Sequence, residues 1–201
     1  MLEKAIAEIK KRGFTVLPRQ FSEQKAKTLR KTLDRLWEKE EKNSQREKIP
    51  FLNVGHKNVY NLQNKDFAFI ELLLGNPLVE NILMSFLNDE WYKQIPRNKP
   101  NYILRAFGAR SSGEKDMPLH IDSFIPGSGD YVWVMQVALI LEEQNLENGC
   151  TLVAPKTHLS GKYAENDNEL IQPVALRTQV GDIVIWDSRL WHGALGNKSK
   201  G

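Results

Sequence analysis

Residues 179–195 read QVGDIVIWDSRLWHGAL, and they contain two short β-rich runs, DIVIWD and RLWHGAL, behind a QVGD turn. β-branched and aromatic residues favour strands, whereas Gly and Asp favour turns. Similar short runs recur from residue 102 onward, namely YILRAF, PLHID, YVWVMQVALIL, CTLVAP and PVALRT. Many short strands at this spacing predict a mainly β fold, either a sandwich or a barrel.

Apolar residues in the N-terminal part recur at helical spacing instead. One stripe begins at Ala5, and a second follows Ser22, a residue type that caps helix N-termini. Two further helices are predicted across residues 67–74 and 78–87. Between the first two helices, GFTVLP at residues 13–18 predicts a short strand.

No repeat, low-complexity tract or linker divides the chain. We therefore expect residues 1–201 to form a single domain, in which a mostly helical part (residues 1–100) buttresses a β core (residues 101–201). The run EKEEKNSQREK at residues 38–48 mixes charges of both signs, which is typical of a solvated helix end and loop.

We expect a cytoplasmic protein that binds neither nucleic acid nor membrane. The near balance of 28 Lys and Arg against 25 Asp and Glu neither demands nor excludes nucleic acid, but no basic and aromatic stripe is present. Cys150 is the only cysteine, so no intrachain disulfide can form. The N-terminus lacks the continuous apolar core of a signal peptide. The longest apolar run, residues 131–141, is too short to span a bilayer. The oligomeric state is not indicated.

His120 and Asp122 stand two apart in the otherwise apolar segment LHIDSF. On a strand these side chains would share one face, about 7 Å apart, which is close enough to hold one ion between them. His192, which follows the run DIVIWD, is the best-placed third ligand. Two imidazoles and one carboxylate form the facial triad of non-heme Fe(II) oxygenases, which leaves positions open for cosubstrate and O2.

The same spacing also fits arrangements that hold no iron. His120 and Asp122 could form a hydrogen-bonded structural pair, and His192 could be a half-exposed residue at a strand end. Zinc also accepts two histidines and one carboxylate, and it would activate water. The spacing alone leaves these alternatives open.

Four segments resemble landmarks of a known family, in the same order. They are GFTVLPRQFSEQKAKTLR (13–30), LHID (119–122), NLENGCTLVAPKTH (145–158) and VGDIVIWDSRLWHG (180–193). The third resembles the family's "ENG…PGSH" segment, with PKTH in place of PGSH. Because these segments span nearly the whole chain, we find that the sequence resembles the phytanoyl-CoA dioxygenase family of Fe(II)/2-oxoglutarate-dependent oxygenases.

The resemblance implies a double-stranded β-helix, a cupin-like jelly roll, behind N-terminal helices. It implies that His120, Asp122 and His192 are the catalytic metal ligands, with Fe(II) as cofactor and 2-oxoglutarate as cosubstrate. By this likeness the protein would hydroxylate an unidentified small molecule, while O2 is consumed and 2-oxoglutarate is decarboxylated to succinate. Asp122 argues against a halogenase, because related halogenases lack this carboxylate.

The resemblance also suggests which residues contact the cosubstrate. It places Trp133 beside 2-oxoglutarate, but Gln136 is the alternative, because residues three apart face opposite ways on a regular strand. Arg105 is a candidate for binding an anion of cosubstrate or substrate, and a surface position fits it equally well. We expect His158 to be a surface or capping histidine and His56 to be a loop residue, and neither to be a ligand.

The sequence departs from the family pattern at the distal carboxylate of 2-oxoglutarate. Family members bind it with an arginine about ten residues after the last histidine ligand, whereas only Lys198 and Lys200 are cationic after His192. We expect that the chain stops short and that the arginine and a closing strand lie beyond Gly201. Alternatively, Arg105 or another upstream cation replaces it, or the protein does not depend on 2-oxoglutarate. The last case leaves open a non-catalytic metal- or ligand-binding jelly roll, beside the oxygenase and a zinc hydrolase.

Overall fold

The computed structural model describes residues 1–43, 57–166 and 168–199. Its strands are β1 Phe14–Leu17, β2 Asn58–Tyr60, β3 Gly108–Arg110, β4 Met117–His120, β5 Met135–Leu139, β6 Thr151–Val153, β7 Val174–Ala175, β8 Ile183–Asp187 and β9 His192–Ala194. Its helices are α1 Leu2–Arg12, α2 Glu23–Asn43, α3 Phe67–Leu74 and α4 Pro77–Leu87, with short 3-10 turns η2 Leu62–Asn64 and η3 Thr157–Leu159.

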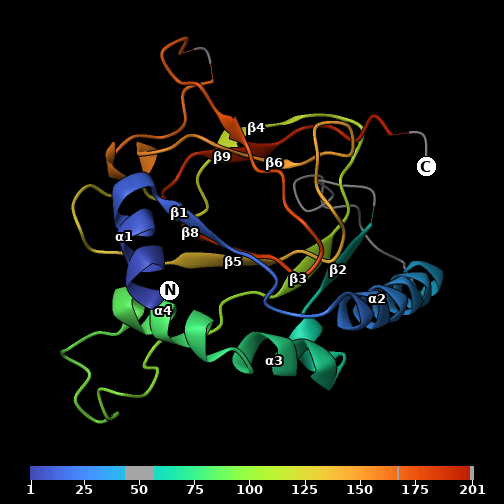
Figure 1. Cartoon of the computed structure of the whole chain (residues 1–201), viewed down its shortest axis with the longest axis horizontal. Coiled ribbons are helices and arrows are strands. Elements are labelled where there is room, and N and C mark those ends of the chain that lie inside the picture. Colours follow the sequence, from blue (N-terminus) through green and yellow to red (C-terminus); the bar gives the residue numbers. More distant parts are fainter. Residues whose placement is uncertain (44–56, 167, 200–201) are drawn as a thin grey trace.

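Two antiparallel sheets face each other in the centre of the molecule (Figure 1). One has the strand order β1-β8-β5 and the other β4-β9-β6-β7, while β2 and β3 pair separately. Helices α1 and α4 cover the outer face of the β1-β8-β5 sheet. The predicted mainly β jelly roll with N-terminal helices is therefore confirmed. Because β1 pairs with β8, the N-terminal part contributes a strand to the core sheet.

Strand β8 is buried on both faces and organises the core. Ile183 and Ile185 pack outward against α1 and α4. Val184 and Trp186 point the other way and share a cluster with Val153 from the opposite sheet. Fully burying one such side chain contributes roughly 1.5–3 kcal/mol, so this strand joins the helical layer to the space between the sheets.

The predicted helices are present in the structure, and capping residues mark their ends. Helix α1 ends at Gly13, whose positive φ of 92° suits glycine and whose N–H donates to the Ile9 carbonyl at 2.7 Å. Before α2, the Ser22 hydroxyl accepts a hydrogen bond from the Lys25 N–H at 3.2 Å. Helix α4 begins one residue earlier than predicted, at Pro77, because proline is well tolerated in the first helical turn.

One predicted strand is wrong. The run YILRAF at residues 102–107 forms no strand, and in the described chain no strand pairs with it. Ile103 and Leu104 do not pack on a layer, being 87% and 49% exposed, whereas Phe107 at the end of the run packs against the core. A strand begins only at Gly108, where β3 pairs with β2, which the sequence did not predict. The other predicted runs each overlap a strand.

The charge run at residues 38–48 begins as expected, because α2 extends to Asn43. The rest of that run and His56 lie outside the described residues. Among the helices of the described part, none is long and apolar enough to cross a membrane.

Candidate metal centre

The structure brings His120, Asp122 and His192 together. His120 lies on β4 directly opposite His192 on β9, and their ring centroids are 4.4 Å apart. Asp122 follows the end of β4, so the strand does not hold it. Its N–H instead donates to the Ser188 carbonyl at 2.9 Å, in the turn between β8 and β9. One potential ligand atom from each of the three side chains lies within 4.8 Å of the other two.

Hydrogen bonds orient both imidazoles toward the carboxylate. His120 Nδ1 lies 3.0 Å from the Pro118 carbonyl, and His192 Nδ1 lies 2.9 Å from the Leu190 carbonyl. A carbonyl oxygen only accepts, so each Nδ1 carries a hydrogen and each neutral ring presents a lone pair at Nε2.

These lone pairs face Asp122. His192 Nε2 is 3.2 Å from Oδ2, and His120 Nε2 is 3.6 Å from Oδ1. A lone pair that faces a carboxylate is repelled unless a positive charge lies between them. A bound cation would satisfy all three groups, and the Nδ1 hydrogen bonds are the outer contacts that metal-bound histidines usually make.

Electrostatics favour the forms of these groups that bind metals. Burial lowers the pKa of His120, and the nearby His192 lowers it further, which keeps the imidazole neutral. Burial alone would raise the pKa of Asp122. The neighbouring His192 and His120 rings and the cationic Arg110 outweigh burial and lower that pKa, so the carboxylate stays ionised.

The group is anchored on one side and open on the other. The His192 side chain is only 7% exposed, whereas those of His120 and Asp122 are 37% and 35% exposed. Two imidazoles and one carboxylate with an open side fit Fe(II) in a facial triad, and they also fit a catalytic zinc ion.

Gln136 reaches this centre from the opposite sheet. Its Nε2 donates to Asp122 Oδ2 at 2.9 Å. Trp133 lies before β5 begins and is 47% exposed, with its ring centroid 6.4 Å from that of Tyr131. Of the two alternatives, the structure places Gln136 at the centre. Arg105 is exposed in an irregular segment, and its guanidinium stacks 4.0 Å from the centroid of the Phe124 ring.

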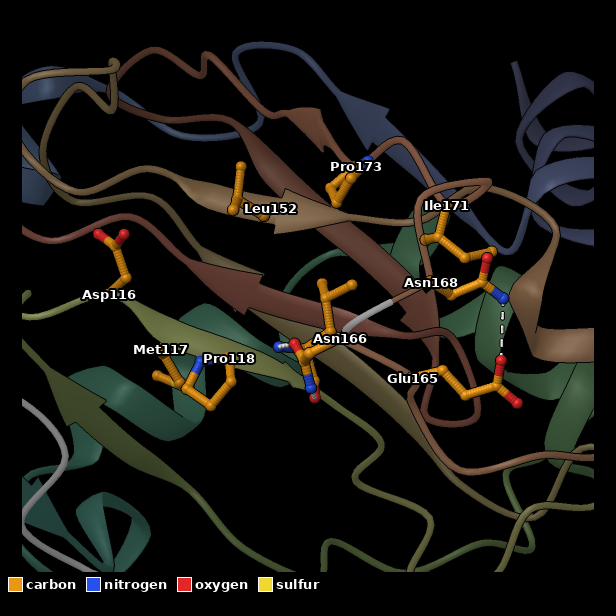
Figure 2. Close-up of a pocket in the computed structure, with 10 residues that line it drawn as sticks. Asp116, Met117, Pro118, Leu152, Glu165, Asn166, Asn168, Ile171 and Pro173 are labelled. Carbon is orange, nitrogen blue, oxygen red and sulfur yellow. Dashed lines mark hydrogen bonds between the residues drawn. The ribbon is translucent and has the colours of Figure 1, made fainter.

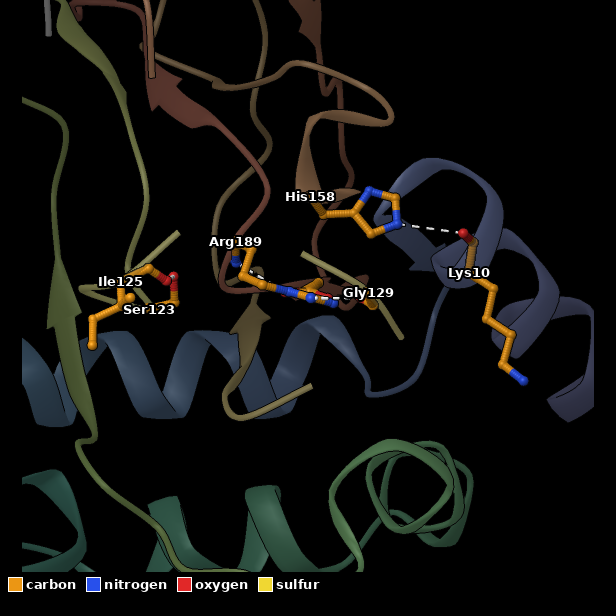
Figure 3. A network of polar contacts seen from close by, with 7 residues as sticks. Lys10, Ser123, Ile125, Gly129, His158 and Arg189 are labelled. Carbon is orange, nitrogen blue, oxygen red and sulfur yellow. Dashed lines mark hydrogen bonds and ion pairs between the residues drawn. The ribbon is translucent and has the colours of Figure 1, made fainter. Parts of the chain in front are cut away.

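His158 differs from the expected surface residue, because it is only 2% exposed. Its Nε2 lies 3.3 Å from the Lys10 carbonyl in the last turn of α1, which is a capping contact (Figure 3). The surface position was therefore wrong and the capping role is confirmed. Gly13, which ends α1, packs against this ring.

A buried ion pair beside the centre was not predicted. Arg189 Nη2 lies 2.6 Å from Asp187 Oδ2, and both side chains are at most 5% exposed. Arg189 Nη1 also donates to the Gly129 carbonyl at 2.8 Å (Figure 3). The only sequence signal was the spacing of two residues in DSR, just before His192. That spacing does not distinguish a buried pair from a surface turn.

A separate pocket of about 240 Å³ is lined by residues of β4 and β6 and by the segment between β6 and β7 (Figure 2). Leu152 lines it from the face of β6 opposite to the buried Val153. Its lining includes none of the three clustered side chains, so this pocket is distinct from the metal centre.

Known proteins resemble this chain in fold and sequence. The solved non-heme alpha ketoglutarate dependent carbocyclase SnoK, from nogalamycin biosynthesis, matches with a TM-score of 0.73 and 17% identity over 99% of this chain and 79% of its own. The epimerase SnoN, solved with Fe3+, alpha ketoglutarate and nogalamycin RO, matches with a TM-score of 0.66 and 16% identity over 100% and 79%. At such identities these likenesses show the fold alone.

A curated relative, "Dioxygenase af480" of Aspergillus fumigatus, is 28% identical over 206 residues, which cover 98% of this chain and 62% of the relative. The chain thus spans less than two thirds of that relative's length. The family profile described as phytanoyl-CoA dioxygenase (PhyH) matches residues 9–201. This match covers nearly the whole chain and includes both strands that carry the clustered histidines. The chain therefore belongs to the phytanoyl-CoA dioxygenase family.

Proposed function

We propose that this chain is an Fe(II)- and 2-oxoglutarate-dependent oxygenase that hydroxylates a small molecule and converts 2-oxoglutarate to succinate. The observation that carries the proposal is the convergence of His120, Asp122 and His192 on one point with one side open. Family membership supports it, as does the fold shared with SnoN, whose structure contains Fe3+ and alpha ketoglutarate.

Each residue has a distinct role in this proposal. His120 and His192 would bind the metal through Nε2, because the Pro118 and Leu190 carbonyls hold their Nδ1 hydrogens. Asp122 would bind through its carboxylate. Bound Fe(II) and 2-oxoglutarate would together supply the O2-activating chemistry.

Gln136 would be a positioning residue. Its hydrogen bond to Oδ2 restricts rotation of the Asp122 carboxylate, so that Oδ1 stays directed toward His120 and Oδ2 toward His192. The buried His192 excludes water from one side of the centre, which leaves exchange of ligands to the exposed side.

Trp133 and Arg105 remain proposals as ligand-binding residues. Their exposure leaves both side chains accessible to a ligand. If Arg105 contacts the substrate, the distal carboxylate of 2-oxoglutarate needs a cation from elsewhere. Arg105 lies in an irregular segment, and its guanidinium is held by stacking on the Phe124 ring.

Anaerobic titration tests the proposal. We expect Fe(II) and 2-oxoglutarate together to produce a visible charge-transfer band, and Asp122→Ala to abolish it while the far-UV circular dichroism spectrum is kept. Hydroxylation is tested by screening small molecules for stimulated succinate release. Tight zinc binding without any band from Fe(II) and 2-oxoglutarate would favour a hydrolase or a non-catalytic metal site instead.

A further inference from the structure

The segment that follows Asp122 exposes an unusual number of large apolar side chains. Phe124 is 68% exposed, Ile125 59%, Tyr131 66% and Trp133 47%. The intervening Val132 is buried, whereas the rings of Tyr131 and Trp133 are exposed and neighbour each other, with centroids 6.4 Å apart. Large apolar side chains exposed together in one segment point to a binding site, because soluble proteins rarely expose extended apolar surface.

This segment is held at its beginning, middle and end by Ser188 and Arg189. The Ser188 carbonyl accepts the N–H groups of Asp122 and Ser123. Arg189 Nη1 donates to the Gly129 carbonyl (Figure 3), and the Ser188 N–H donates to the Val134 carbonyl at 3.1 Å. Since Arg189 is itself fixed by its buried ion pair, the segment has a fixed shape.

Phe124 is held in a conformation that its own packing does not explain. Its φ of 64° lies in the left-handed region, which costs energy for a bulky residue. Arg105 stacks on its ring, and the Tyr163 hydroxyl donates to its carbonyl at 3.2 Å. These contacts hold the exposed ring two residues beyond the Asp122 ligand.

We propose that Phe124, Ile125, Tyr131 and Trp133 form the substrate-recognition surface of the metal centre, and that the substrate has a large, apolar, ring-bearing body. This inference rests on the proposed function. Phe124 follows Asp122 by two residues, and the Asp122 side chain is on the open side of the centre. Aromatic faces bind ring systems by offset or edge-to-face packing, whereas a small polar substrate would leave them in water.

A neutral bicyclic probe, 2-naphthol, tests this surface. The chain is loaded anaerobically with Fe(II) and 2-oxoglutarate, and binding is followed by the fluorescence of the probe. We expect the double variant F124S/W133S to bind it about tenfold more weakly, as two aromatic contacts are lost.

The matched control is W91S/Y92S, which removes two aromatic residues that are 80% and 53% exposed in another part of the chain. We expect unchanged probe affinity in this control. All four positions are substantially exposed, so thermal midpoints of both variants should match the unmodified chain.

Location is tested by NMR. Lines of bound 2-naphthol should broaden when the centre holds paramagnetic Mn(II) and stay sharp when it holds Zn(II). The inference is overturned if the unmodified chain does not bind the probe, if F124S/W133S binds it equally well, or if Mn(II) causes no broadening. The charge-transfer band is read in the same samples. If the band is present in the unmodified chain and in both variants while probe affinity is unchanged, this inference alone is refuted. If the band is absent in the unmodified chain, the proposed function is refuted and this inference with it.

Discussion

Replacement of Arg189 by methionine should destabilise the chain severely. The Arg189 side chain makes three contacts with the Asp187 carboxylate, at 3.0, 3.2 and 2.6 Å, and a fourth with the Gly129 carbonyl at 2.8 Å. Asp187 is 1% exposed, so the variant would leave a buried carboxylate without its countercharge, with the backbone N–H of residue 189 still donating to Oδ1. Breaking one side of such a pair costs about 3–5 kcal/mol.

In a chain of 201 residues, each kcal/mol shifts the thermal midpoint by roughly 2–4 °C. A loss of about 4 kcal/mol therefore corresponds to a midpoint lower by roughly 8–16 °C. The assay is urea unfolding of the metal-free chain, followed by circular dichroism and tryptophan fluorescence. The two transitions must coincide before a free energy is assigned.

The double variant D187N/R189M provides the control. It removes the buried charge together with its partner, so it should be clearly more stable than R189M alone. Arg189→Lys keeps the charge but loses the planar fork, and it should lie between R189M and the unmodified chain. A loss below about 1 kcal/mol in R189M, or a double variant less stable than R189M, would show that the two side chains are not a coupled unit.

Five further substitutions have expected outcomes. Gln136→Leu should weaken Fe(II) binding by about 10- to 100-fold, measured by anaerobic titration, because the carboxylate ligand loses the N–H that orients it. Gly193→Ala should cost about 1–3 kcal/mol in urea unfolding and weaken metal binding, because its Cβ would meet the backbone of β4. Burial lowers the pKa of His158 from 6.5. Its contribution to the unfolding free energy is therefore present above about pH 6.5 and is lost as the pH falls through the folded-state pKa. H158Q should flatten this pH dependence, which urea unfolding at a series of pH values measures. Trp186→Phe should lower the stability of the metal-free chain less than Trp191→Phe does. Among the described residues the buried Trp186 Nε1 has no hydrogen-bond partner, whereas Trp191 Nε1 donates to the Lys162 carbonyl, a bond worth about 1 kcal/mol.

The strands that the sequence predicted correctly share a local signal. In DIVIWD, both faces of the strand are apolar, and the structure buries both. The run YILRAF carries the same residue types, but no neighbouring strand of the described chain pairs with it. β-Propensity describes a fit to a pleated, half-buried surface, and only the tertiary structure supplies that surface. Strand β2 is the opposite case, a strand that exists but was not predicted. Its three residues are too few to show the two-residue alternation of a strand.

The candidate site shows a similar division. His120 and His192 were identified from strands, and these strands do pair. Which of Trp133 and Gln136 points to the site depended on where β5 begins. Because β5 begins at Met135, the alternation of side chains along the strand does not extend back to Trp133. The Asp187–Arg189 pair could not be predicted, because whether two charged residues near a turn are buried depends on what covers them.

The position of Asp122 was predicted for a reason that holds only in part. Its spacing predicted that it shares one face of a strand with His120, but β4 ends at His120 and a carbonyl of the β8–β9 turn positions Asp122. That turn also leads directly into β9 and His192, so one short segment sets the relative position of two of the three candidate ligands. Any change that shifts the turn should therefore weaken metal binding even if it touches no ligand. Conversely, a metal that binds only the native arrangement stabilises that arrangement by mass action. Saturating Fe(II) should therefore raise the thermal midpoint of R189K, because the metal restores the alignment of the turn that the lysine fixes less well. If R189K lowered stability while metal affinity stayed unchanged, the turn would support the fold without controlling the site.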